Sequence, residues 1–504
     1  REGLTVDIDN FTQEFRLQGE SGRLNWLVGV FYSRESLDTT DRIRFGDSSA
    51  AYANATAIGQ TAALLGAPRE LFDLTSAPVD AFLGGDPVPS LLGLLNPALN
   101  QVYLTPNTSG QGQQADTWHQ EAEDIAFFTH NELSLTDQLI LTVGLRYSQS
   151  NKEMSGVLDA ASNSCASMQA LEAGFGVFSG LNTAANAGNS TAIAARTLLA
   201  LVCAPQGNTA ANRTAANPWT AERDENEYSG TLSLRYHMTD DLMFYGGYSR
   251  GYKAGGFNLD RSAFTGLFPG MTATQANTLL SGNQLGFEPE FTDSYELGMR
   301  STILNGTTFF NVTVFHTVLS DYQLNAFNGT AFITRNIPEA ISQGVEIDIM
   351  ARLTPNLMIQ GGINYTDAYN NSTVAFVPNS PADTIVSGTP LIQAPEWSVT
   401  GAITWDVPVT ESIGARFYLD ARYDTEHQTQ ALGRNPISDM GDTVTLNGRV
   451  ALGDINERWS IELWGRNLTD ELIYAGFNAP LQSGTVGAYT NEPRTWGVTL
   501  RARH

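Results

Sequence analysis

Residues 412–424 read Ser-Ile-Gly-Ala-Arg-Phe-Tyr-Leu-Asp-Ala-Arg-Tyr-Asp and alternate between two kinds of side chain. Ile413, Ala415, Phe417, Leu419, Ala421 and Tyr423 fall on one side, whereas Gly414, Arg416, Tyr418, Asp420, Arg422 and Asp424 fall on the other. Successive side chains of a β-strand point to opposite faces. The stretch therefore predicts a strand with one apolar face and one charged face.

The same alternation recurs along the whole chain, for example at 139–147, 341–352, 443–452 and 495–501. It predicts about fifteen strands. Their expected bounds are 7–18, 24–38, 117–133, 138–153, 225–238, 242–255, 290–303, 307–324, 341–353, 357–370, 394–405, 412–427, 442–452, 458–472 and 491–503. The predicted fold class is all-β, an antiparallel up-and-down β-barrel that crosses a membrane.

The connections between these strands alternate between short and long. The short ones are 19–23, 134–137, 239–241, 304–306, 354–356, 406–411 and 453–457. The long ones are 39–116, 154–224, 256–289, 325–340, 371–393, 428–441 and 473–490. Barrels of bacterial outer membranes have short periplasmic turns and longer outer loops, whereas a soluble sandwich has no reason for such a rule.

Composition agrees with a barrel in a lipid bilayer. The 504 residues include 16% charged and 10% aromatic residues, and no apolar run is long enough for a membrane-spanning helix. A net charge of −25 argues against a nucleic-acid partner, since phosphates need basic side chains. Trp397 and Trp405 share one face, roughly 20 Å apart along a tilted strand. That spacing suits the two aromatic girdles of a membrane barrel.

Fifteen strands are an odd number, whereas single-chain bacterial barrels use an even one. An open edge in lipid would leave unpaired backbone groups. We therefore expect further strands before Arg1, with a miscount by one strand as the alternative. On this interpretation residues 1–504 are the C-terminal part of one barrel.

Several stretches resemble the TonB-dependent receptors of outer membranes. They are Phe11–Gln18 (FTQEFRLQ), Asn25–Tyr32 (NWLVGVFY), Phe244–Asn258 (FYGGYSRGYKAGGFN), Glu288–Arg300 (EPEFTDSYELGMR), Gln343–Glu346 (QGVE), Gly465–Asp470 (GRNLTD) and Glu492–Arg501 (EPRTWGVTLR). Each is weak alone, but their order and spacing across nearly the whole chain make the resemblance specific.

The resemblance implies a 22-stranded barrel around an N-terminal plug, with this chain beginning near the eighth strand. It implies location in the outer membrane of a Gram-negative bacterium and import of a scarce ligand driven by TonB with ExbB and ExbD, through the missing plug and TonB box. The ligand could be a siderophore, cobalamin or a glycan, and a ferric siderophore is the first expectation. The alternative is a passive diffusion porin.

Catalytic motifs are absent: the six histidines are scattered, with no HExxH, GxSxG or metal-ligand cluster. The sequence therefore predicts neither an enzyme nor a cofactor or metal. Cys165 and Cys203 lie in one long loop, so a disulfide is expected in an oxidising envelope, with two free thiols as the alternative.

Ligand contact is expected from aromatic and polar residues near the loops. The candidates are Arg250, Tyr252, Lys253, Phe257, Asn258, Tyr322, Asn325, Phe327, Arg335 and Asn336. Arg250 or Lys253 would suit an anionic iron complex. The alternative for each residue is a girdle or wall position that supports the barrel. The loops 39–116 and 154–224 are interpreted either as lids over the site or as exposed, variable surface.

Overall fold

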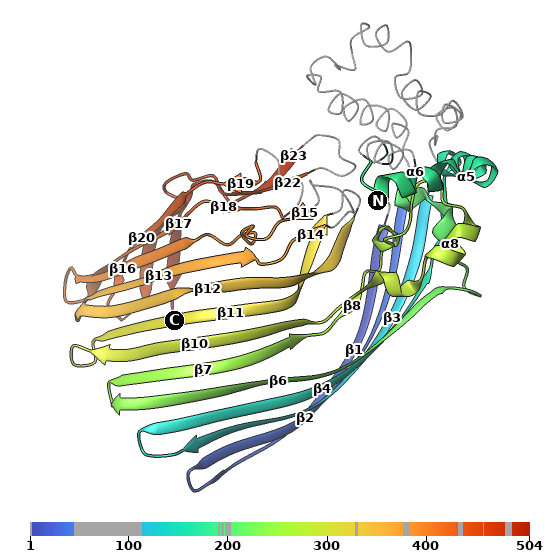
Figure 1. The fold of residues 1–504 in the computed structure, drawn as a ribbon. Coiled ribbons are helices and arrows are strands. Elements are labelled where there is room, and N and C mark those ends of the chain that lie inside the picture. Colours follow the sequence, from blue (N-terminus) through green and yellow to red (C-terminus); the bar gives the residue numbers. More distant parts are fainter. Residues whose placement is uncertain are drawn as a thin grey trace, which may run out of the picture.

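A computed structural model describes residues 3–44, 113–189, 203–327, 331–375, 384–431, 437–456, 458–478 and 486–503, together with residues 192 and 196. Within these residues one antiparallel sheet of sixteen strands dominates the molecule (Figure 1). Fifteen strands follow one another in chain order. They are β1 (Gly3–Ser21), β2 (Leu24–Arg44), β3 (Gln113–Ser134), β4 (Leu139–Val157), β6 (Trp219–Thr239), β7 (Leu242–Lys253), β10 (Glu290–Ile303), β11 (Thr308–Phe327), β12 (Phe332–Thr354), β13 (Leu357–Asn370), β16 (Trp397–Pro408), β17 (Ile413–Asp424), β20 (Thr443–Asp454), β21 (Trp459–Arg466) and β24 (Thr495–Ala502).

The remaining elements are short and lie in the long connections. β5 (Ala160–Ala161) pairs with β3, and four two-stranded ribbons are formed by β8 (Gly256–Phe257) with β9 (Gly286–Phe287), β14 (Val374–Ala375) with β15 (Thr384–Ile385), β18 (His427–Gln428) with β19 (Asp439–Met440), and β22 (Tyr474–Asn478) with β23 (Val486–Thr490). The helices are α5 (Asn163–Phe175), α6 (Val177–Asn186) and α8 (Ala273–Leu279), and 3-10 turns lie at Pro205–Gly207, Thr209–Ala211, Arg261–Ala263 and Gly282–Leu285. None of the described helices is long and apolar enough to cross a bilayer.

The fifteen predicted strands are confirmed, but several extend further than their apolar alternation. The strands expected at 458–472 and 491–503 are shorter, because β21 ends at Arg466 and β24 begins at Thr495. β2 continues to Arg44, β6 already starts at Trp219, and the hairpin of β11 and β12 reaches Phe327 and Phe332. The expected loop 325–340 is therefore wrong, because most of it is strand. Backbone hydrogen bonds between neighbouring strands remain available where the side chains no longer alternate. The strand tips thus stay paired without an apolar signal in the sequence.

Tight turns join the strands at one end of the sheet, and the long connections gather at the other (Figure 1). At the turn between β10 and β11, Leu304, Asn305 and Gly306 have φ values of 53°, 55° and 85°. Asn and Gly tolerate this left-handed region, which explains why they punctuate the sequence there. We call the two ends of the sheet the turn end and the loop end.

The apolar side of the sheet is uncovered. Directly opposed residues share a face, and the rows Val30–Phe127–Tyr147–Tyr228, Leu232–Tyr248–Tyr295, Leu297–Val314–Val345–Tyr365–Trp397 and Trp405–Phe417–Val450–Leu463–Val498 run across the strands. Leu297 is 66% exposed and Trp405 is 51% exposed. The prediction of an apolar face available to lipid is confirmed. We call it the outer face and its opposite the inner face.

The order of strands in the sheet begins at β1 and finishes at β24. Within the described residues these two strands do not pair with each other. Closure of the wall and a total of 22 strands stay predictions.

Candidate ligand-binding mouth

A compact body, which we call the cap, lies at the loop end of β3, β4 and β6 (Figure 1). It comprises residues 158–189, 203–218 and 259–285. Its apolar core includes Met168, Phe178, Phe268, Met271 and Leu285, all at most 5% exposed. Two long connections of the sheet thus fold together around one core. The described part of loop 154–224 is therefore folded structure.

Local sequence signals define the helices of the cap. The Ser162 side chain accepts a hydrogen bond from the backbone N–H of Cys165 and caps the start of α5, which ends at Gly176 with φ 62°. Thr272 and Gln275 form a capping box at the start of α8. Cys165 and Cys203 form a disulfide with a Cα–Cα distance of 4.8 Å, in agreement with the disulfide expected from the sequence.

Glu172 connects the three helices of the cap. Its carboxylate accepts hydrogen bonds from the backbone N–H groups of Phe178 (2.7 Å) and Ser179 (3.1 Å) in α6, and from Gln275 Nε2 (2.6 Å) in α8. Burial alone would raise the pKa of Glu172, but these hydrogen bonds stabilise the charged form and lower the pKa below its ordinary value. The ionised carboxylate therefore holds the cap together.

A buried ion pair fixes the cap to the sheet. Asp116 of β3 and Arg261 of the cap are both fully buried, and Arg261 Nε donates to Asp116 Oδ2 at 2.7 Å while Nη2 contacts Oδ1. Arg261 also donates to the Asn208 carbonyl at 3.0 Å, and the backbone N–H of Asp159 donates to Asp116 at 3.1 Å. Burial raises the pKa of Asp116, and the guanidinium opposes that shift. The pair is shielded from water.

The cap packs on the inner face of the wall. Trp118, Met154, Trp219 and Ala221 contribute to its apolar core. The cross-strand pairs Trp118–Gly156–Trp219 and Met154–Ala221 belong to the same side of the sheet as Lys152 and Arg223, opposite the uncovered apolar rows. The cap therefore covers the inner surface at the loop end of these strands.

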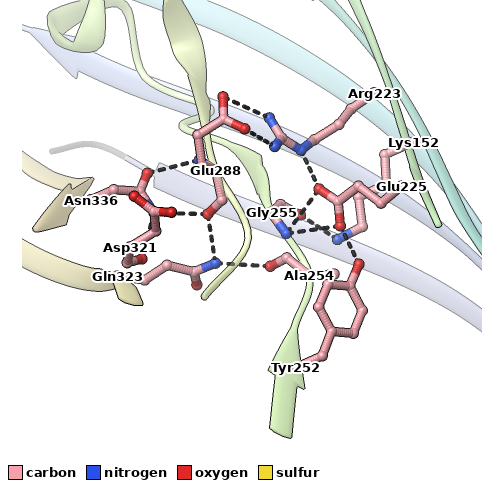
Figure 2. A network of polar contacts seen from close by, with 10 residues as sticks. All are labelled: Lys152, Arg223, Glu225, Tyr252, Ala254, Gly255, Glu288, Asp321, Gln323 and Asn336. Atoms are coloured by element: carbon pink, nitrogen blue, oxygen red, sulfur yellow. Dashed lines mark hydrogen bonds and ion pairs between the residues drawn. The ribbon is translucent and has the colours of Figure 1, made fainter. Parts of the chain in front are cut away.

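Beside the cap, a polar network connects β4, β6, the segment that follows β7, and the β11–β12 hairpin (Figure 2). Arg223 of β6 contacts both Glu225 and Glu288, and the Tyr252 hydroxyl donates to Glu225. The Gly255 N–H also donates to Glu225, at 3.1 Å, and Lys152 Nζ donates to the Gly255 carbonyl at 2.5 Å. A Cβ at Gly255 would lie 2.5 Å from the Phe287 carbonyl oxygen, so only glycine fits.

The tip of the β11–β12 hairpin completes the network. Gln323 Nε2 donates to the carbonyls of Ala254 (2.9 Å) and Glu288 (3.0 Å). Asn336 Nδ2 donates to the carbonyls of Glu288 (2.8 Å) and Asp321 (2.7 Å), and its Oδ1 accepts from the Glu288 N–H. Figure 2 shows Gln323 and Asn336 pointing toward Glu288, with Gln323 also reaching Ala254 in the segment that follows β7. The hairpin thus braces the chain leading into the cap.

The structure gives several predicted ligand residues a protein partner instead. Arg250 is paired with Asp293 at 2.8 Å and stacks on Phe291, and its cross-strand partners place it on the outer face with Tyr248. Phe257 is 9% exposed in the core of the cap. Asn258 donates to the carbonyls of Leu285 and Thr334. Tyr252 and Asn336 belong to the network of Figure 2. These positions suit the supporting role given above as the alternative, and ligand contact by these residues stays a prediction.

The other predicted residues are less constrained. Lys253 and Asn325 are exposed. Tyr322 packs beside a second apolar cluster of Leu324, Ala326, Ile337 and Ile385, and Arg335 is half-buried. The backbone of Phe327 pairs with Phe332, whereas its side chain lies outside the described residues. Ligand contact by any of these residues stays a prediction.

Sequence reasoning missed the residues that organise the mouth, namely Asp116, Lys152, Arg223, Glu225, Arg261 and Glu288. Glu288 does open one of the stretches that resemble the receptor family, and Gly255 lies inside another. Asp116 and Arg261 are 145 residues apart in the chain, so no local pattern connects them. No group of three or more His, Cys, Asp or Glu is placed to hold a metal ion in the part of the chain that the structure describes.

A sheet with an uncovered apolar face on one side and a folded body packed on the other is typical of the wall of a transmembrane β-barrel. Residues 2–468 match the family described as "TonB dependent receptor-like, beta-barrel", so the chain belongs to that family.

Particular relatives are more distant. The pesticin receptor of Yersinia pestis is 24% identical over 265 residues, covering 45% of this chain and 36% of the relative. The ferric yersiniabactin uptake receptor FyuA of Yersinia pestis superposes with a TM-score of 0.59 at 16% identity, covering 99% of this chain and 54% of that one. The siderophore receptor PiuA of Acinetobacter baumannii superposes with a TM-score of 0.57 at 13% identity, covering 99% of this chain and 56% of that one. The chain thus spans roughly a third to a half of their lengths, and these likenesses between structures show the fold.

Proposed function

We propose that this chain forms the wall and mouth of an outer-membrane receptor that imports a scarce ligand, a ferric siderophore being the first candidate. The carrying observation is the asymmetry of the sheet: its outer face is apolar and uncovered, while the cap packs on its inner face at one end only. Lipid can therefore contact the outer face, while the inner face can line a gated, aqueous interior. The likeness to FyuA, a ferric yersiniabactin uptake receptor, and to PiuA, a siderophore receptor, supports this choice of ligand.

The cap favours gated import over passive diffusion. It is held by a disulfide, a buried ion pair and an apolar core, so it is a fixed obstacle at the mouth. In the complete receptor, TonB with ExbB and ExbD would supply the energy through the plug. Transport needs no bond to be made or broken, so we propose a transporter and no enzyme.

The test is ligand accumulation in the Gram-negative host. The gene is deleted, and uptake of radiolabelled ferric siderophores, cobalamin and oligosaccharides is compared before and after collapse of the proton gradient. We expect accumulation of one ligand class to require both the gene and the gradient. Unchanged accumulation of every ligand after deletion would contradict the proposal, and uptake that survives collapse of the gradient would favour a porin.

A further inference from the structure

The β11–β12 hairpin takes part in two apolar clusters at the loop end of the sheet (Figure 1). Ile333, near the tip of the hairpin, is 2% exposed and belongs to the core of the cap. Ile337, further along β12, is fully buried in the cluster of Leu324, Ala326, Ile337 and Ile385, which we call the second cluster. Ile385 lies on β15, in another long connection of the sheet. One hairpin therefore contributes side chains to the interiors of two bodies that are formed by different connections.

The two bodies are joined through the backbone ladder of the hairpin. Ala326 of β11 belongs to the second cluster and is paired in register with Ile333 of β12, which belongs to the cap. The ladder continues to the pair of Tyr322 with Ile337. Side chains of both bodies are thus fixed to one set of inter-strand hydrogen bonds. A displacement of either body must move the hairpin or break its ladder.

Side-chain amides attach the hairpin to the cap a second time. Gln323 Nε2 donates to backbone carbonyls on both of the chains that connect residues 259–285 to the sheet. Nearer the tip, Asn258 Nδ2 donates to the Thr334 carbonyl at 3.0 Å, and the Thr334 N–H donates to Asn258 Oδ1 at 2.8 Å. The hairpin is therefore held to the cap by hydrogen bonds as well as by the apolar side chain of Ile333.

The second cluster reaches a further connection on the other side of the hairpin. Ala431, in the connection 428–441, packs against it. The Gln393 N–H donates to the Gln428 carbonyl at 2.7 Å, which links that connection to 371–393. The described parts of these two connections thus share one packing unit with the hairpin.

We propose that the β11–β12 hairpin is a connector that makes the cap and the second cluster open as one unit. The mouth then has two cooperative states, in which both bodies are docked or both are released. A molecule that displaces one body is felt at the other, because coupling between two parts of a protein is reciprocal. This inference goes beyond the proposed import function and depends on the packing of the mouth alone.

The experiment perturbs the second cluster and measures the cap. Ile385→Ala removes a buried side chain that lies outside both the hairpin and the cap. Hydrogen exchange of the purified full-length receptor in detergent micelles then reports on the amides of α5 and α8. We expect their exchange to become at least about tenfold faster, because truncation of a buried isoleucine loosens a coupled body by such a factor or more. Val386→Ala is the matched control, since Val386 is the next residue and is 56% exposed, and it should leave the cap unchanged.

A second set of variants tests whether the hairpin carries the coupling. Gln323→Ala/Ile333→Ala weakens both attachments of the hairpin to the cap, so the additional effect of Ile385→Ala on cap exchange should fall below about threefold in that background. In the reciprocal direction, Arg261→Met in the cap should accelerate exchange of residues 384–393. The amides of β16 and β17 show whether the wall of each variant is folded. If Ile385→Ala does not fold, Ile385→Val replaces it, with an expected effect of about threefold.

Faster exchange of residues 384–393 with unchanged exchange of the cap would show that the two bodies open independently, and would overturn the inference. An equal acceleration by Val386→Ala would overturn it too, as would an undiminished effect in the Gln323→Ala/Ile333→Ala background. The measurement needs neither a transported ligand nor energised cells. A failure of import and a failure of the connector therefore give different results.

Discussion

Replacing Arg261 by Met tests whether the cap is fixed to the wall by its buried ion pair. The substitution leaves Asp116 fully buried beside an apolar side chain and removes the donor to the Asn208 carbonyl. Removing one partner of a buried pair costs about 3–5 kcal/mol. Since 1.4 kcal/mol is a factor of ten, opening of the cap should become about a hundred to several thousand times more frequent.

Hydrogen exchange of the cap amides in detergent micelles measures this opening, while the amides of β16 and β17 report on the wall. The control is Arg34→Met on β2, where the exposed guanidinium lies 3.3 Å from Glu121 and the pair contributes at most about 1 kcal/mol. The double variant Asp116→Leu/Arg261→Met should regain most of the lost protection, because it leaves no buried charge. If Arg261→Met exchanges like Arg34→Met, the ion pair does not hold the cap.

Three further predictions concern the cap and the strand ends. The double variant Cys165→Ser/Cys203→Ser opens a covalent loop with a sequence separation of 38 residues and should destabilise the cap by about 4 kcal/mol. Proteolysis within residues 158–189 should then be faster, and an unchanged rate of cleavage would contradict the prediction. The pKa of Glu172 is lowered in the fold, so its stabilisation of the cap is present above the ordinary glutamate pKa and is lost as pH falls through the folded pKa. Cleavage of the cap by pepsin, measured between about pH 3 and 6, should therefore accelerate more steeply toward acid in the wild type than in Glu172→Gln. The same dependence of the cleavage rate on pH in both proteins would refute this. Asn467 has a φ of 47°, a left-handed conformation that glycine adopts more readily than alanine. Asn467→Ala and Asn467→Gly both lose the side-chain hydrogen bonds to Glu471 and Glu492, so Asn467→Ala should lower the heat resistance of the folded band in gel electrophoresis more than Asn467→Gly does. The reverse order would count against a backbone contribution.

The strands of the wall could be predicted from the sequence because each carries its own signal. Period-two alternation in a stretch such as 412–424 depends only on nearest neighbours, and β17 was found within one to three residues of its expected bounds. The strand tips could not be predicted, because β12 between Phe332 and Ala340 is stabilised by backbone pairing with β11 and lacks clean alternation. The tight turns could also be predicted from local sequence, because residues such as Asn305 and Gly306 favour the left-handed conformation that the turn requires.

Some stretches that resemble the receptor family make sense only in three dimensions. Gly298 lies under the Tyr245 ring, where a Cβ would be 2.4 Å from the ring carbons, and each residue belongs to a different stretch. Asp470 likewise meets Arg494, whose backbone N–H donates to the Asp470 carboxylate at 3.1 Å. The order of the stretches was visible in the sequence, whereas their contacts depend on which strands become neighbours.

The cap explains why ligand residues were hard to choose from sequence. Residues near strand ends were selected because they are polar or aromatic, but in this fold the cap needs the same chemistry for its own attachment. Asn258 and Asn336 satisfy backbone carbonyls, and Phe257 fills an apolar core. Groups that lack a protein partner are more informative about a ligand than groups that merely suit one.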